Sequence, residues 1–196
     1  MSVKDLIMRT RTVRRFDGKT EVDRDILLEL VDLGRLGASA GNKQPLKFIC
    51  INEAASREAL FASLAFAAYL KDWTPAPEER PKGYIIILGD TSIATNFWCD
   101  HGIAAQNILL GATEKGLAGC ILGAVNKAGV TRDFAIPEHL ELLLVVALGK
   151  PAETVVLEPL GEDGDVKYWR DAQGVHHVPK RSLEEVAYAV NPPLAK

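Results

Sequence analysis

The stretch Gly102-Ile103-Ala104-Ala105-Gln106-Asn107-Ile108-Leu109-Leu110-Gly111-Ala112 is apolar on most sides of a helix. A helix of this kind is buried on more than one face. We expect it to span about 95–115 and to end at Gly116, since glycine commonly follows the last turn. Its small residues allow close packing, so it lies either at the centre of the core or at a subunit interface.

Segments with the pattern of strands lie on both sides of this helix. Tyr84–Leu88 and Leu142–Leu148 are continuous apolar runs, as expected of buried strands. Shorter strands are predicted at 48–51 and 118–123, and helices at 23–34, at 53–64 and after 123, with a loop over 73–83. A first short helix is capped by Ser2 and Asp5. Because helices separate the strands, the order predicts an α/β sandwich with helices covering a central sheet.

The last part of the chain has a different pattern. Residues 166–170 and 174–178 flank a turn and predict a β-hairpin. Lys180 and Arg181 then precede Ser182 and Glu185, which form a capping box for a final helix. Two cations before a helix N-terminus make a candidate phosphate contact.

Composition narrows the class of protein. The chain has 196 residues, 47% of them hydrophobic and 25% charged, and predicts one soluble domain over 1–196. A net charge of −3 gives no general attraction to nucleic acid or to a membrane surface. No signal peptide or membrane span is recognisable at the sequence level. Three well-separated cysteines favour a reducing compartment, so we expect a cytoplasmic location.

Several kinds of site are not favoured. The Gly-rich dinucleotide and Walker A fingerprints are absent, as is a nucleophile elbow. Cys99, Asp100 and His101 do not share one helix face, so no metal site is expected. His176 and His177 alternate across a strand and are interpreted as a surface pair on the hairpin.

Four arginines lie within seven residues near the start of the chain: Arg9, Arg11, Arg14 and Arg15. Guanidinium groups interleaved with threonine hydroxyls are well matched to phosphate, because each guanidinium presents a rigid fork of donors. The alternative is a solvated basic helix end.

The segment Ser39-Ala40-Gly41-Asn42-Lys43-Gln44-Pro45 lies between a predicted helix and a strand. Its hydroxyl and carboxamides match the edge of a heterocycle, where donors and acceptors alternate. The alternative is an ordinary Asn/Gly turn.

Together these pieces resemble the nitroreductase family of FMN-dependent oxidoreductases. The resemblance covers nearly the whole chain. It depends on Arg11-Thr12-Val13-Arg14-Arg15-Phe16, on Ser39–Pro45, and on the succession from Gly102–Asn107 to Gly116–Cys120.

The resemblance implies an α+β fold, a three-layer α/β/α sandwich that forms an intertwined homodimer with two FMN sites at the interface. Arg11 and Thr12 would bind the phosphate and ribityl region, and Arg14 would lie near the pyrimidine edge. The other implied contacts are Ser39, Ala40 and Asn42 from the partner subunit, Leu122 and Gly123 near flavin N5, and Lys180 or Arg181 at the phosphate. Lys71 is a candidate for a further basic contact, in a region that aligns poorly with the family.

The resemblance also implies an activity, in which NAD(P)H delivers hydride to flavin N5 and a small acceptor, such as a nitroaromatic or quinone, takes the electrons in a ping-pong sequence. Thr10, Ala38 and Leu46 depart from the arginine, proline and tryptophan frequent in the family, so the acceptor stays open. Two alternatives remain: a reductive dehalogenase or flavin-fragmenting enzyme of the same fold, or a non-catalytic flavin-binding carrier or sensor.

Overall fold

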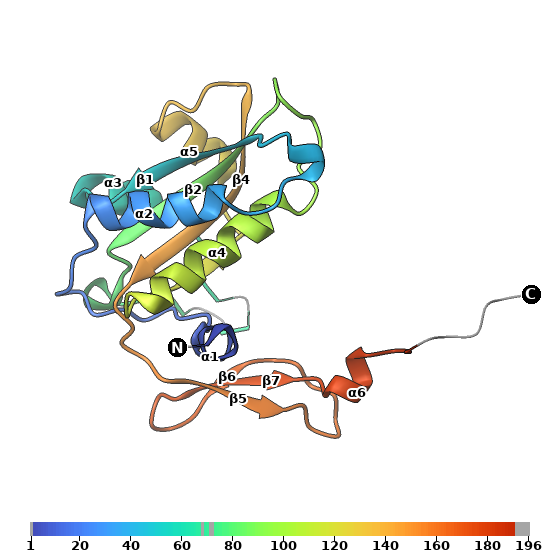
Figure 1. The fold of residues 1–196 in the computed structure, drawn as a ribbon. Coiled ribbons are helices and arrows are strands. Elements are labelled where there is room, and N and C mark those ends of the chain that lie inside the picture. Colours follow the sequence, from blue (N-terminus) through green and yellow to red (C-terminus); the bar gives the residue numbers. More distant parts are fainter. Residues whose placement is uncertain (1, 68, 71–72, 191–196) are drawn as a thin grey trace, which may run out of the picture. The chain divides into compact units, whose positions relative to one another are not determined.

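The computed structural model describes residues 2–67, 69–70 and 73–190. Their contacts group into two compact units, Met1–Ala152 and Glu153–Lys196, and each is described by itself (Figure 1). The single domain expected over 1–196 stays a prediction. Lys71 lies outside the described residues.

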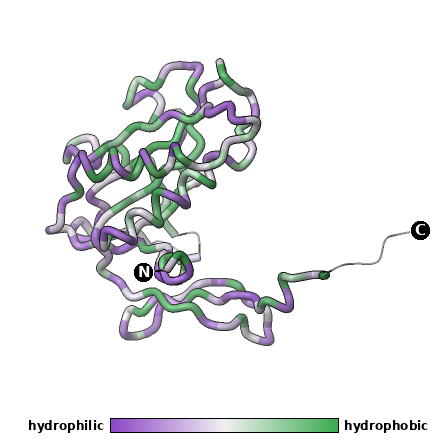
Figure 2. Tube along the Cα trace, viewed as in Figure 1, coloured by the Kyte–Doolittle hydropathy of each residue, from purple (hydrophilic) through white to green (hydrophobic). Residues whose placement is uncertain are grey.

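A four-stranded sheet forms the centre of the first unit. Its order is β1 (Leu46–Ile51), β2 (Gly83–Asp90), β4 (Leu140–Gly149) and β3 (Ala118–Leu122), and all neighbours are antiparallel. Every residue of β2 is buried, which explains its continuous apolar run. The hydrophobic stretches of the strands stand out in Figure 2.

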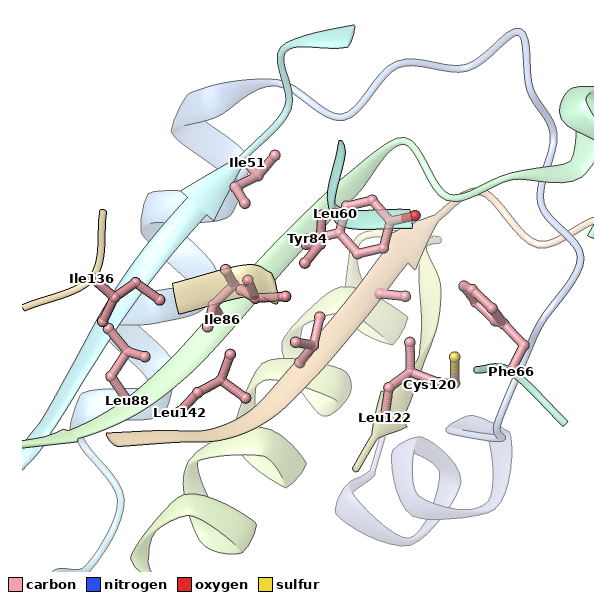
Figure 3. Packing of buried hydrophobic residues seen from close by; sticks show 13 residues of the cluster. Ile51, Leu60, Phe66, Tyr84, Ile86, Leu88, Cys120, Leu122, Ile136 and Leu142 are labelled. Carbon is pink, nitrogen blue, oxygen red and sulfur yellow. The ribbon is translucent and has the colours of Figure 1, made fainter. Parts of the chain in front are cut away.

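Helices cover both faces of this sheet. On one face, α2 (Arg24–Arg35) and α4 (Asp100–Glu114) pack against Ile85 and Ile87 of β2. On the other, α3 (Ala54–Phe61) and α5 (Lys127–Asp133) contribute Leu60 and Val130 to a cluster around Ile86 (Figure 3). The alternation of residues along β2 therefore divides the core into two layers, and the predicted three-layer sandwich is confirmed.

Close packing between α2 and α4 explains the glycines of the two helices. A Cβ at Gly111 would lie 2.3 Å from Leu33 Cδ1, and one at Gly34 would lie 3.2 Å from Ile108. Gly34 is the second-to-last residue of α2, which agrees with the predicted helix over 23–34. Helix α2 ends at Arg35, and Gly37 follows soon after.

Helix α4 begins at Asp100, so the predicted start near Thr95 is wrong. The backbone at Trp98 has a φ of 45°, in the left-handed region that a right-handed helix excludes. The side chain of Asn96 accepts a hydrogen bond from the Trp98 N–H at 2.9 Å. This local turn replaces the first helical turn.

Two further boundaries differ from the sequence predictions. Helix α3 ends at Phe61 rather than near Leu64, because Leu64 bridges to Val125. The proline-rich segment contains a short 3-10 helix, η2 (Pro77–Glu79), before β2 begins.

The second unit is a small three-stranded sheet in the order β5 (Val155–Pro159), β7 (His176–Lys180) and β6 (Trp169–Arg170), followed by α6 (Leu183–Val186). The predicted hairpin is confirmed by the antiparallel pairing of β6 with β7. Strand β5 was not predicted, and it pairs with β7 in parallel. None of the hydrophobic side chains described in this unit is buried, and most of those in β5 are half-buried.

Candidate functional site

The arginine-rich segment after α1 (Val3–Arg9), residues 10–16, is called the arginine loop. Its Thr10 hydroxyl lies 2.9 Å from that of Thr113 near the C-terminal end of α4, and both side chains are buried. Thr12 then forms a parallel bridge with Gly119 of β3, and the Val13 N–H donates to the Gly119 carbonyl at 3.0 Å. The loop is thus fixed to the end of one helix and to the side of one strand.

Within the arginine loop, Arg11 is a partly buried cation without a carboxylate partner among the described residues. Its Nη2 donates to the Ile7 carbonyl at 2.6 Å. Its Nε is buried and has no hydrogen-bond acceptor among residues 2–67, 69–70 and 73–190, and no described Asp or Glu forms an ion pair with it. Burial lowers the pKa of Arg11. A desolvated guanidinium with a free donor is costly unless an anion satisfies it.

Arg15 is used differently. Its Nε donates to Glu79 Oε1 at 2.9 Å, and the neighbouring Phe16 N–H donates to the Glu79 carbonyl at 3.0 Å. Phe16 is fully buried. Arg15 therefore anchors the loop, while Thr12 is exposed and Arg14 is partly buried on the same segment.

Leu122 and Gly123 lie at the end of β3, the strand that the arginine loop contacts at Gly119. Leu122 is buried and pairs with Val145 of β4, whereas Gly123 is exposed just beyond the strand. Thr12 pairs with Gly119, three residues earlier, so the strand rise puts Leu122 about 10 Å further along β3. The structure thus brings Arg11, Thr12 and Arg14 to the strand that carries Leu122 and Gly123.

The second predicted group lies on the segment Ala38–Pro45, here called the amide loop, which contains the 3-10 helix η1 (Ala40–Asn42). Ser39 Oγ donates to Asp100 Oδ2 at 2.6 Å and accepts from the Gln44 N–H at 2.9 Å. The Ala40 N–H donates to Asp100 Oδ1 at 3.0 Å. Sequence reasoning missed this anchoring role of Asp100.

Asn42 and Gln44 both have a φ of 52°, so the amide loop turns tightly. Gln44 Nε2 donates to Asn42 Oδ1 at 3.2 Å, which leaves the Asn42 carboxamide nitrogen outside this bond. A pocket of about 220 Å³ lies beside the loop. Its lining is Gly34, Arg35, Gly37, Ala38, Ser39, Gln44, Leu46, Phe48 and Asp100.

Within one chain the two loops lie at opposite ends of α4 (Figure 1). The amide loop is bonded to Asp100 in its first turn, and the arginine loop to Thr113 in its last. Thirteen residues of helix separate these anchors, which is about 20 Å. The structure therefore does not bring Ser39, Ala40 and Asn42 together with Arg11, Thr12 and Arg14 within one chain.

Lys180 and Arg181 lie at the end of β7 in the second unit, beside a concavity of about 700 Å³ between the strand ends and α6. Arg181 forms an ion pair with Glu185. Lys180 is exposed, and no carboxylate among the described residues forms an ion pair with it. Ser182 caps α6 by accepting from the Glu185 N–H at 3.2 Å, which confirms the Ser182 half of the predicted capping box.

The histidine pair is not a surface pair, which corrects the sequence interpretation. His176 is fully buried and stacks on Tyr168, with ring centroids 5.2 Å apart. His177 points to the other side, stacks on Trp169 at 4.1 Å, and bonds Glu158 at 3.0 Å. Both rings are thus part of the packing of this small unit.

Neither a metal-binding cluster nor a membrane-spanning helix is found among the described residues. No three or more His, Cys, Asp or Glu side chains among them gather where they could hold a metal ion. No described helix has both the length and the apolar character that a membrane crossing requires.

Comparison with known proteins gives consistent matches. Residues 7–150 match the model of the nitroreductase family. A protein of Methanothermobacter thermautotrophicus named "Putative NADH dehydrogenase/NAD(P)H nitroreductase" is 31% identical over 160 residues, which cover 78% of this chain and 79% of that protein.

Solved structures show the same fold. A nitroreductase family protein from Clostridium novyi NT has a TM-score of 0.66 at 24% identity and covers 77% of this chain and 87% of its own. A "putative nitroreductase in complex with FMN" from Desulfovibrio desulfuricans has a TM-score of 0.70 at 21% identity, and the match covers 100% and 99% of the two chains. The second unit lies outside the family-model match but inside this last alignment.

Proposed function

Since the chain belongs to the nitroreductase family, we propose that it is an FMN-dependent oxidoreductase that passes reducing equivalents from NAD(P)H to a small organic acceptor such as a nitroaromatic or a quinone. The printed names of relatives and the FMN complex of a structural neighbour support this proposal. The observation in this chain that carries it is the uncompensated cation at Arg11.

The residues of the arginine loop fit an FMN phosphate. Arg11 has a buried Nε without an acceptor among the described residues and no carboxylate beside it. A phosphate would satisfy that donor and offset the desolvated charge. Thr12, one residue further, is exposed and offers a hydroxyl to the same anion. Of the two predicted phosphate contacts Lys180 and Arg181, Lys180 is the more available, because Arg181 is already paired with Glu185.

The 20 Å separation of the two loops along α4 supports a site shared between two copies of the chain. In this proposal the arginine loop, Leu122 and Gly123 come from one protomer. Ser39, Ala40 and Asn42 come from the amide loop of its partner. The Ser39 hydroxyl holds the loop to Asp100, so we assign ring recognition to loop backbone groups and to the Asn42 carboxamide.

Bound FMN supplies hydride chemistry at its N5, so the protein needs no acid–base pair of its own. Arg14 would hold its positive charge near the pyrimidine edge, where it would stabilise negative charge on the flavin. Leu122 and Gly123 shape the N5 side with backbone groups. NAD(P)H and the acceptor use one site in turn, which predicts ping-pong kinetics with parallel initial-velocity lines.

An anaerobic absorption spectrum before and after addition of NAD(P)H tests the function. We expect a yellow protein whose flavin absorption bleaches with NAD(P)H and returns with a quinone. Yellow protein that NADH and NADPH leave unbleached would favour a carrier or sensor. Colourless protein that does not take up FMN would refute the proposal.

The proposed site predicts that Arg14→Ala and Asn42→Ala each weaken FMN retention, the second with the dimer intact. The flavin content after gel filtration measures FMN retention, and the elution volume shows whether the dimer is intact. Unchanged flavin content in both variants would place the cofactor elsewhere.

A further inference from the structure

Trp98 combines an exposed side chain with a strained backbone. Its side chain is 70% exposed, and its φ is 45°. Bulky residues rarely adopt this conformation, and residues that do so are enriched at functional sites.

The neighbours of Trp98 hold it in this conformation. The ring of Phe97 is buried against Gly89: a Cβ added to Gly89 would lie only 2.4 Å from the ring. On the other side, the Asp100 N–H donates to the Phe97 carbonyl at 3.0 Å while its carboxylate binds Ser39. The backbone therefore cannot relax at Trp98 without removing Phe97 from the core or releasing the amide loop.

These contacts fix the backbone at the position that carries the indole. Trp98 is two residues from Asp100, at the end of α4 that carries the amide loop. In the proposed function this end faces the flavin of the partner subunit, so the inference below rests on that proposal. An exposed indole therefore lies at the same end of α4 as the loop that contacts the flavin in the proposed site.

We propose that Trp98 binds the electron acceptor by stacking, and that the acceptors it selects are planar, electron-poor aromatic or quinonoid rings. The indole is the most electron-rich aromatic side chain, and offset stacking with an electron-poor ring is favourable. An acceptor without a planar ring gains nothing from this contact. Trp98 is then an acceptor-binding residue, and the strain at φ 45° is the cost of presenting it.

Fluorescence tests the contact without turnover. Oxidised, FMN-loaded protein is titrated with 1,4-naphthoquinone in the absence of NAD(P)H, with correction for absorbance by the quinone. We expect saturable quenching in the parent protein and in the control Trp169→Phe, whose residue lies in the second unit. Trp98→Phe should lose most of it. Quenching that persists in Trp98→Phe would overturn the inference.

A second variant separates binding from folding. Trp98→Gly removes the indole and suits the left-handed backbone, since glycine adopts positive φ readily. We expect a Tm equal to or above that of the parent, a roughly tenfold lower kcat/KM for 1,4-naphthoquinone, and less than a twofold change for ferricyanide, which does not stack. Trp98→Phe should retain most of the quinone activity.

The outcomes distinguish this inference from the proposed function. Suppose that the parent protein binds FMN and is reduced by NAD(P)H, but that Trp98→Gly changes the activity with both acceptors equally. That result would overturn only the role of Trp98. A Trp98→Gly variant that dissociates into monomers shows an interface residue instead, which also overturns it. Protein that binds no FMN overturns both.

Discussion

At the scale of the residue, two arginines four positions apart illustrate how environment assigns a role. Arg15 is neutralised by Glu79 of the same unit, whereas Arg11 has a buried donor with no acceptor among the described residues. A buried charge is tolerated when a partner is present. The molecule supplies that partner for Arg15, and we propose that the FMN phosphate supplies it for Arg11.

This contrast predicts opposite effects of matched substitutions. Arg11→Met should lower FMN affinity about 10- to 100-fold, which corresponds to the 1.5–3 kcal/mol of a charged hydrogen bond, and should leave Tm of the flavin-free protein nearly unchanged. Arg15→Met should lower that Tm and leave FMN affinity within about threefold. Titration of flavin-free protein and thermal unfolding measure the two effects. Equal losses of affinity in both variants would contradict the assignment.

A histidine of the second unit gives a prediction for pH. Burial lowers the pKa of His177, but hydrogen bonds and charges from Asp171 and Glu158 outweigh that effect and raise the pKa above its ordinary 6.5. The folded state therefore favours the protonated ring. The stabilisation is complete below about pH 6.5 and is lost as the pH rises through the folded-state pKa.

Titration of His177 by NMR in the full-length protein checks this shift. We expect a pKa above 6.5 in the parent, a lower one in Glu158→Gln, and no change in the control Glu162→Gln, which lies outside the His177 hydrogen bonds. A titration unaffected by Glu158→Gln would show that the ring contact is not formed in solution.

At the scale of the element, β3 links the core to the arginine loop. A Cβ at Gly119 would lie 2.2 Å from the Ala147 carbonyl oxygen of β4, and Gly119 is also the bridge partner of Thr12. No side chain fits there unless the strands separate. The glycine is thus required both for the sheet and for the position of the loop.

Gly119→Ala should therefore destabilise the protein by about 2–3 kcal/mol or more, because a backbone clash cannot be relieved by a rotamer change. Gly102→Ala in α4 is the control: a Cβ there meets nothing within 4 Å, and alanine favours a helix by about 1 kcal/mol. Denaturant unfolding measures both. A mild effect of Gly119→Ala would mean that β3 is less tightly paired than described.

The elements also show what the sequence could predict. Strands β2 and β4 followed from their apolar runs, and the hairpin of β6 and β7 from its turn. The start of α4 did not, because Phe97 and Asp100, on either side of the turn at Trp98, contact Gly89 and Ser39, which are distant in sequence. Strand β5 was missed because its parallel partner β7 begins many residues later.

In the candidate site, too, some features could be predicted from the sequence and others could not. The arginine loop and the amide loop were recognised by residue type and spacing. The different uses of Arg11 and Arg15, and the anchoring by Asp100, depend on which carboxylate lies beside which donor. Only the fold determines those pairs.

At the scale of the whole molecule, the central claim is that each flavin site needs two chains. The arginine loop and the amide loop are anchored about 20 Å apart on α4 of one chain. We propose that the homodimer brings the arginine loop of one protomer to the amide loop of its partner. Arg11→Met damages the first half of a site and Asn42→Ala the second.

Mixed dimers of these two variants, isolated with two different affinity tags, test this claim most directly. Shared sites predict that each mixed dimer has one doubly damaged site and one intact site, and so binds one FMN with the affinity of the parent protein. If each site were built from a single chain, each site of the mixed dimer would carry one substitution. The mixed dimer would then bind FMN as weakly as the Arg11→Met and Asn42→Ala homodimers. A titration without a parent-affinity site would contradict the account.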